Sequence, residues 1–257
     1  MLIKRALWSS ILMFAVVAVV ETPLFAAAAP AGKAPVPAPR SAPAPSPAAS
    51  LEQVLASMDQ QATSFKNAQA TFVWDQYTKV VDDHDLQEGN ISFRRQGADV
   101  QMAANIVKGN GQPMAKVVLF ADGKVRLYEP KIDQVTEYDA GKNKAEFESF
   151  LVLGFGGSGR DLSKSFDVKY SGNEQVQGVT AAKLELTPKS QKVRNMFDHI
   201  ILWIDTARGV SVQQQFFTRD GDYRLAKYSN IKLNDKISDD AFKLKTTSKT
   251  KVVRPNG

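Results

Sequence analysis

The sequence predicts a mainly β protein of the α+β class, with about eleven antiparallel strands in one sheet that curls on itself. Three observations predict this fold. Apolar residues recur at every second position through most of the chain from residue 68 onward. Turn residues separate these runs at the spacing of hairpins. Asp122-Gly123 stands between two such runs, and Asp-Gly is a strong hairpin signal because both turn positions need positive φ.

Residues 1–28 have the layout of a secretory signal peptide. Lys4 and Arg5 precede an apolar run over residues 6–20, and Ala26-Ala27-Ala28 provides a small-residue cleavage site. An uncleaved anchor is the alternative, but this run of 15 residues is shorter than the roughly 20 needed to span a bilayer. The leader therefore predicts an exported protein.

Residues 29–50 form a Pro/Ala-rich linker in which Lys33 and Arg40 are the only charged residues. Such a composition buries too little apolar surface to fold, so we expect a disordered tether with extended polyproline geometry. The remaining residues, 51–257, suit one domain with a sizeable core.

The composition excludes several kinds of chemistry. The chain has no cysteine, which excludes disulfides, thiol catalysis and lipid attachment through an N-terminal cysteine. Removing residues 1–28 leaves 31 basic and 26 acidic side chains, so the net charge falls from +6 to +5. This mild excess indicates a solvated basic surface, with an anionic membrane or an acidic partner as alternatives. No nucleic-acid partner is expected.

The elements follow a simple order. An amphipathic helix begins after Ser50, a residue suited to the N-cap. Six strands are expected between residues 68 and 138, then a short helix over 144–153, then five strands between 166 and 231. The apolar stripe of the first helix, at helical spacing, consists of Leu51, Val54, Leu55, Met58, Ala62 and Phe65.

A glycine run follows the second helix. Gly154, Gly156 and Gly159 fit the G-x-G-x-x-G pattern, but no βαβ unit surrounds them, so nucleotide binding has little support. The run also departs from the P-loop and G-x-S-x-G patterns. We expect a flexible lid hinge instead, formed by Gly154, Gly156, Gly157 and Gly159.

The residues for enzymatic chemistry are scarce. The chain has two histidines, His84 and His199, and no candidate Ser-His-Asp set. His84 lies in an acidic turn with Asp82, Asp83 and Asp85, where a loose cation site is the alternative to an ordinary polar turn. We therefore expect no enzyme activity, no cofactor and no metal.

Arg95 is unusual because it shares strand parity with Ile91 and Phe93. If Phe93 faces inward, Arg95 faces inward too, and a buried guanidinium needs partners. Either the strand ends or bulges at Gln96-Gly97 and frees Arg95 to solvent, or Arg95 donates hydrogen bonds to the backbone of a covering segment such as 144–160.

The predicted sheet and helices carry many large apolar residues. In a filled barrel these residues form the core, whereas in a larger, partly open barrel they line a cavity for an apolar ligand. The sequence leaves both interpretations open. The candidate cavity residues are Leu55, Met58, Phe72, Trp74, Phe93, Met102, Phe120, Leu127, Phe147, Phe150, Leu151, Trp203 and Phe216.

Three motifs carry a resemblance to a known family. They are Asp122-Gly-Lys-Val-Arg-Leu-Tyr-Glu-Pro130 with Gln134-Val-Thr136, then Glu185-Leu-Thr-Pro-Lys189, and finally Tyr228-Ser-Asn-Ile231 with Asn234, Ile237 and Phe242. Over residues 51–244 the chain resembles the LolA family of periplasmic outer-membrane lipoprotein carriers. The resemblance implies an unclosed β-barrel with a helical lid over a hydrophobic cavity.

The same resemblance implies a function and its partners. The cavity takes up the acyl chains of lipoproteins, which the carrier ferries through the periplasm from the inner to the outer membrane. A lipoprotein-releasing ABC transporter loads the carrier, an outer-membrane acceptor unloads it, and the carrier is a monomer. A family arginine holds the lid shut, and Arg95 is the matching position, with Arg94 as the register alternative.

The chain also departs from the family pattern. Gln96 stands where the family usually has proline, and Val100-Gln-Met102 replaces aromatic residues in the next strand. The alternative function is therefore a related lipid-binding, glycolipid-binding or lipoprotein-sensing regulatory module on the same fold.

Overall fold

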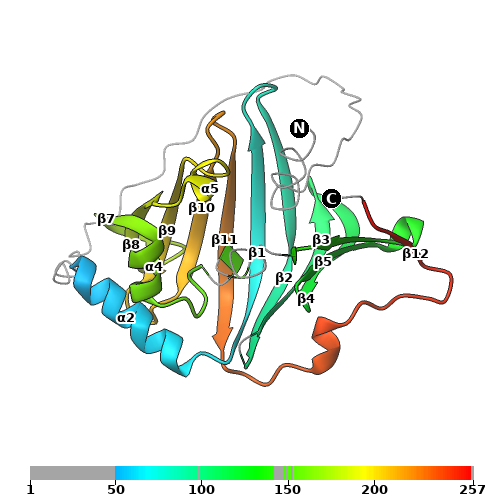
Figure 1. Cartoon of the computed structure of the whole chain (residues 1–257), viewed down its shortest axis with the longest axis horizontal. Helices are drawn as coiled ribbons and strands as arrows, with labels where there is room; N and C mark the ends of the chain where they lie inside the picture. The colour runs from blue at the N-terminus through cyan, green and yellow to red at the C-terminus, as the bar shows by residue number, and fades with distance from the viewer. Residues whose placement is uncertain (1–49, 98, 142–147, 149, 152, 256–257) are drawn as a thin grey trace, which may run out of the picture.

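The computed structural model describes residues 50–255, except residues 98, 142–147, 149 and 152. Its main feature is one sheet of twelve strands in the order β12-β6-β5-β4-β3-β2-β1-β11-β10-β9-β8-β7. The sheet curls without closing, and β12 and β7 form its two edges (Figure 1). The predicted mainly β fold is confirmed. The strands of the meander are β1 (Asn67–Thr78), β2 (Asp83–Gln96), β3 (Asp99–Gly109), β4 (Gln112–Ala121), β5 (Lys124–Glu129) and β6 (Gln134–Asp139).

The second half of the sheet follows after the helical segment. Its strands are β7 (Phe166–Val176), β8 (Val179–Pro188), β9 (His199–Asp205), β10 (Ser211–Phe217), β11 (Tyr223–Leu233) and β12 (Lys251–Val253). β12 pairs with β6 in parallel, whereas the other neighbouring strands run antiparallel. The short helices are η1 (Pro130–Ile132), α4 (Gly159–Ser165), α5 (Gln191–Arg194) and η3 (Asp239–Phe242).

The first helix, α2 (Leu51–Ser64), begins as the sequence predicts. The Ser50 hydroxyl accepts a hydrogen bond from the Gln53 amide, and the Gln53 side chain bonds back to the Ser50 amide, which completes a capping box. Val54 and Met58 are its buried residues. No helix in the described part of the chain is long and apolar enough to cross a membrane.

The predicted Asp-Gly hairpin is present between β4 and β5. Asp122 and Gly123 have φ of 56° and 69°, the positive values that this turn requires. Asn110 and Gly111 form an equivalent turn between β3 and β4, with φ of 47° and 75°. These turns fix the register of the meander, because a tight turn leaves the flanking strands one way to pair.

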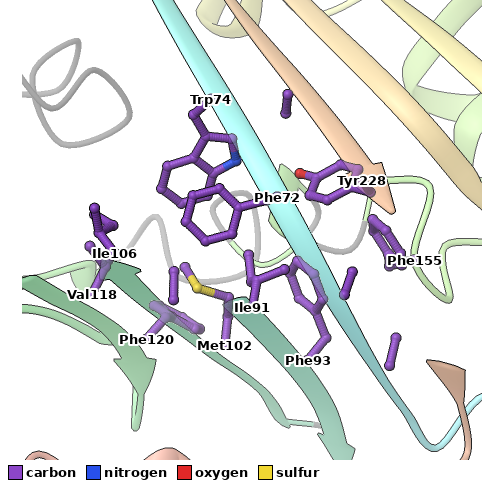
Figure 2. Close-up of a cluster of buried hydrophobic side chains, with 14 of the residues drawn as sticks. Phe72, Trp74, Ile91, Phe93, Met102, Ile106, Val118, Phe120, Phe155 and Tyr228 are labelled. Carbon is purple, nitrogen blue, oxygen red and sulfur yellow. The ribbon is translucent and has the colours of Figure 1, made fainter. Parts of the chain in front are cut away.

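The core lies on one face of the sheet, which we call the inner face. One cluster joins β1–β5 to β11 and includes Phe72, stacked on Trp74 with ring centroids 4.1 Å apart (Figure 2). A second cluster lies between β8–β10 and the helices α2 and α4, and includes Met58 and Leu162. Side chains therefore fill much of the space that the curled sheet encloses.

Residues 234–255, which we call the C-terminal arm, cross the opposite, outer face. Phe242 of η3 packs there against Leu119 and Ala121, and the arm ends in β12. The sequence analysis did not predict β12, because three residues are too few to show an alternating pattern. It also did not predict α4, whose start is set by Ser158, which caps the Asp161 amide.

Candidate functional site

A short loop covers part of the inner face, and we call residues 153–158 the lid segment. Its Phe155 is fully buried between two residues of the sheet. The Phe155 ring stacks on Phe93 at 4.9 Å and meets Tyr228 edge-on at 4.9 Å (Figure 2). The lid segment thus inserts an aromatic side chain into the core and closes over it.

Arg95 contacts the lid segment directly. Its Nη2 donates a hydrogen bond of 2.8 Å to the carbonyl oxygen of Gly156. β2 stays paired with β3 through Gln96, so the strand does not bulge to release Arg95. The side chain therefore lies on the inner face with Phe93 and bonds to the backbone of a covering segment, as one of the two sequence-based interpretations proposed.

Arg94 points the other way. Its guanidinium pairs with Asp239 of η3, bonds to Gln101 and lies 4.4 Å from the centre of the Phe242 ring. Arg94 therefore holds the C-terminal arm on the outer face and has no contact with the lid segment. Of the two register alternatives for a lid-locking arginine, the geometry favours Arg95.

A second set of hydrogen bonds holds the lid segment from β10. The Gln214 side-chain amide donates to the carbonyl oxygen of Leu153, and the Ser211 backbone amide donates to that of Gly154 at 2.8 Å. Tyr228 donates to the Gln214 side-chain oxygen at 3.4 Å. Gln214 is only 5% exposed. Our sequence reasoning missed it, although it shares inward parity with Phe216, the same signal that singled out Arg95.

The glycines allow the lid segment to pack this closely. Gly154 and Gly156 have φ of 83° and 78°, in the left-handed region. A Cβ at Gly154 would lie less than 3.0 Å from the Ser211 side chain, and one at Gly156 less than 3.0 Å from the Phe65 ring. In this structure these glycines serve close approach of the backbone, and the predicted hinge motion stays a prediction.

A pocket of about 330 Å³ lies under the lid segment, between α2 and α4. Its size is at the lower end of the range for small-ligand sites. Met58, Leu162 and Phe166 give it an apolar lining, while Arg95 and Asp161 supply charged groups. Lys164 and Ser158 hold the pKa of Asp161 below its usual value, so this carboxylate stays ionised.

The predicted cavity residues divide among several places. Phe72, Trp74, Phe93, Met102, Phe120, Leu127 and Leu151 belong to the first cluster, and Leu55, Met58, Phe150 and Phe216 to the second. Among these residues, Met58 lines the pocket, together with Gly154, Gly156 and Gly157. The others pack against one another, as in a closed and filled core. Phe147 lies outside the described residues.

The position of Trp203 differs from the one we expected from the sequence. We expected it in the cavity, but it lies on the outer face with Val176, Ala181 and Val212. The inward places of β9 belong to Ile200, Leu202 and Ile204, and side chains alternate along a strand, so Trp203 faces outward. The indole N–H of Trp203 donates to Glu174 at 2.6 Å.

The polar groups near the core are few. Burial lowers the pKa of Arg224, whose guanidinium lies 5.7 Å from the Trp74 ring and 5.2 Å from the Phe216 ring. Burial raises the pKa of Tyr228. In the described part of the chain, no three His, Cys, Asp or Glu side chains are placed to hold a metal. His84 and His199 bond to Asp75 and Asp198, away from the pocket.

A family model described as that of an uncharacterized protein matches residues 107–251, more than half of the chain. The chain belongs to this family. No curated protein matches it significantly. An uncharacterized conserved protein from Thermus thermophilus is 13% identical, with a TM-score of 0.50, and the match covers 79% of this chain and 98% of that one. At this identity the likeness shows a shared fold.

Two further solved structures show weaker likeness. A LolA superfamily protein from Nitrosomonas europaea is 13% identical, with a TM-score of 0.37, over 76% of this chain and 98% of that one. An outer membrane lipoprotein-sorting protein domain from Vibrio parahaemolyticus is 12% identical, with a TM-score of 0.40, over 75% and 97%. A LolA superfamily protein is thus among the solved structures with some likeness to this chain. No activity follows from these two matches.

Proposed function

We propose that the protein is a periplasmic carrier that binds the acyl chains of lipoproteins and ferries them from the inner to the outer membrane. The observation that carries this proposal is the hydrogen bond from Arg95 to Gly156. It ties a charged group in the sheet wall of the pocket to a segment that covers the apolar inner face. The LolA-like motifs of the sequence support the same function.

The free energy of acyl-chain burial and the strength of the hydrogen bonds that hold the lid segment are both compatible with a carrier. A buried methylene is worth about 0.8 kcal/mol, so a chain of about 16 carbons gains roughly 12 kcal/mol on leaving water. Such a chain needs a cover in transit. The lid segment is held by hydrogen bonds from Gln214 and Ser211, each worth about 1 kcal/mol net, and from the charged donor Arg95, worth about 1.5–3 kcal/mol. A partner or an entering acyl chain can shift so small a balance between closed and open states.

The proposed cycle needs no chemistry from the protein. The carrier is not an enzyme and uses no cofactor. An inner-membrane lipoprotein-releasing ABC transporter loads it, and an outer-membrane acceptor receives the cargo. In the closed state, side chains such as Phe72 and Phe120 fill the inner face, and opening of the lid segment makes that surface available. The protein acts as a monomer.

A second candidate is a related module that binds another lipid or glycolipid, or that senses lipoproteins. Met102 favours it, because this inward-facing residue stands in the strand where the LolA pattern has aromatic side chains. A flexible thioether fills space differently from a flat ring and changes which ligand the inner face accepts.

Native mass spectrometry of the protein purified from its own periplasm, with lipid extraction of the bound material, separates these functions. Acylated lipoprotein as the bound species supports the carrier. A free phospholipid or glycolipid contradicts it and supports the second candidate. If the purified protein is empty, release of lipoproteins from inner-membrane spheroplasts decides, because a carrier releases them and the second candidate does not.

A further inference from the structure

Five aromatic side chains form a continuous row on the outer face, and its member His84 lies near the end of β2 opposite to Arg95, which lines the pocket. The row crosses β9, β10, β11, β1 and β2, and each member is the direct cross-strand partner of the next. Successive ring centroids lie 4.3, 5.7, 5.0 and 4.8 Å apart. This aromatic row consists, in order, of His199, Phe217, Tyr223, Tyr77 and His84.

Strand parity places the row on the outer face. Ile200, Phe216 and Trp74 belong to the core clusters on the inner face. Side chains alternate along a strand, so the neighbouring His199 and Phe217 face outward. All five rings retain some exposure to solvent. The row is therefore an accessible aromatic surface and is not part of the core.

The hairpin that ends the row is also unusually apolar. Val80 and Val81, at the centre of the β1–β2 turn, are 88% and 66% exposed. Tight turns favour Gly, Asn and Asp at these positions, and β-branched residues suit them poorly. Val73 and Leu86 are also exposed on this hairpin. Its tip projects beyond the neighbouring strands at the top of Figure 1.

Carboxylates surround the aromatic row. Asp75 and Asp198 bond to the two histidines at 2.8 and 2.9 Å, and Asp82 accepts a hydrogen bond from Tyr77 at 2.9 Å. The two adjoining turns contribute three more acidic residues, Asp83, Asp220 and Asp222, and two basic residues, Lys79 and Arg219. This surface is acidic although the chain has a net charge of +6. It suits a ligand that is both apolar and basic.

We propose that the Pro/Ala-rich segment of residues 30–49 of the same chain docks on this aromatic row. Proline recurs at positions 35, 37, 39, 43, 45 and 47, which favours polyproline II geometry. Aromatic surfaces recognise such segments because the preformed helix loses little entropy on binding. The charges are complementary, since the only charged residues of the segment are Lys33 and Arg40.

The segment is long enough to reach the row. It joins the folded domain at Ser50, the N-cap of α2. Twenty residues, 30–49, extend about 60 Å at about 3.1 Å per residue in polyproline geometry. The radius of gyration of a domain of about 200 residues is about 17 Å, so the segment can reach around the domain.

Charge also argues against other occupants. A second copy would bring one acidic aromatic row against another, and an anionic membrane would be repelled by the same carboxylates. The linker, by contrast, is present at high effective concentration because it is covalently attached. Docking fixes the linker on the surface of the domain and covers the exposed side chains of Val80 and Val81.

The absence of cysteine allows a direct test. The test uses the ¹⁵N-labelled chain from residue 29 onward with the substitution Ala44→Cys and a nitroxide spin label attached at position 44. If the segment docks, the label is expected to remove most of the NMR signal intensity of the backbone amides of Tyr77, Phe217 and Tyr223. The reduced, diamagnetic label is the reference. Amides of β6, which is separated from β2 by three strands, are expected to keep their intensity. Equal effects on β6 and the row, or no effect, would overturn the proposal.

Two further measurements complete the test. Lys33→Glu with Arg40→Glu is expected to restore the amide signals of the row, whereas the conservative Arg40→Lys is not. Mixing spin-labelled ¹⁴N protein with unlabelled ¹⁵N protein is expected to leave the row unaffected. Signal loss in that mixture would show docking on a second copy and would contradict docking within the chain.

Discussion

Arg94 and Arg95 are adjacent in β2 and bind opposite sides of the molecule. Arg95 donates to the Gly156 carbonyl of the lid segment on the inner face, and Arg94 pairs with Asp239 of the C-terminal arm on the outer face. One strand thus fastens two separate covering segments. Because the two residues share chemistry and neighbourhood, each is a control for the other.

Arg95→Leu is expected to favour the open lid and to change lipoprotein transfer. Loss of a hydrogen bond from a charged donor shifts the equilibrium by about 1.5–3 kcal/mol, or roughly 10- to 150-fold. Release of lipoproteins from spheroplasts and their delivery to outer membranes measure the effect. Arg94→Leu is the matched control and is expected to leave transfer unchanged. Equal transfer by wild type and Arg95→Leu would remove the lid-locking role.

Gln214→Leu is expected to loosen the lid segment without affecting the sheet. The change leaves the Leu153 carbonyl without its side-chain donor, at a cost of about 1–3 kcal/mol. Hydrogen exchange at residues 154–157 is expected to accelerate by about tenfold or more. Gln215→Leu, on the adjacent outward position, is the control and should exchange like wild type. If both variants behave alike, Gln214 does not hold the lid segment.

Gly156→Ala is expected to destabilise the protein more than Gly111→Ala. Both glycines have nearly equal φ, 78° and 75°, so the backbone strain of the new side chain is the same. The two glycines differ in the free space around them. A Cβ at Gly156 would clash with the Phe65 ring, whereas a Cβ at Gly111 would have no atom within 4 Å. We expect an additional cost of about 1–3 kcal/mol in the free energy of unfolding. Equal denaturation midpoints would contradict close packing at Gly156.

The protein is expected to lose stability in acid, because Glu137 of β6 pairs with Arg126 and Lys124 of β5 and with Arg254 of the C-terminal arm. Arg126, Arg254 and Lys124 lower the pKa of Glu137 to about 2. A carboxylate with a lowered folded-state pKa stabilises the protein above its unfolded value, and that stability is lost as the pH falls toward the folded value. Unfolding free energy should therefore fall between about pH 5 and pH 2. Glu137→Gln should flatten this part of the profile, and an unchanged profile would exclude Glu137 as its cause.

Local signals in the sequence predicted much of the fold. The N-cap at Ser50 and the turn at Asp122-Gly123 are formed by neighbouring residues, so the sequence contains the whole interaction. Trp203 was misplaced because β9 is buried on both faces, and alternation of apolar and polar residues is then absent. Gln214 shares inward parity with Phe216, but its partner is 61 residues away in the chain, so the alternating pattern indicates an inward polar side chain without indicating what it contacts.

The lid segment is held through carbonyl oxygens of Leu153, Gly154 and Gly156, and every amino acid has a carbonyl. These three hydrogen bonds therefore depend on the length of the loop as well as on its residues. Inserting one residue between 153 and 156 displaces at least one of the three acceptors. Relatives that keep these hydrogen bonds should conserve the number of residues in the loop, together with the glycines at 154 and 156 that its close packing requires.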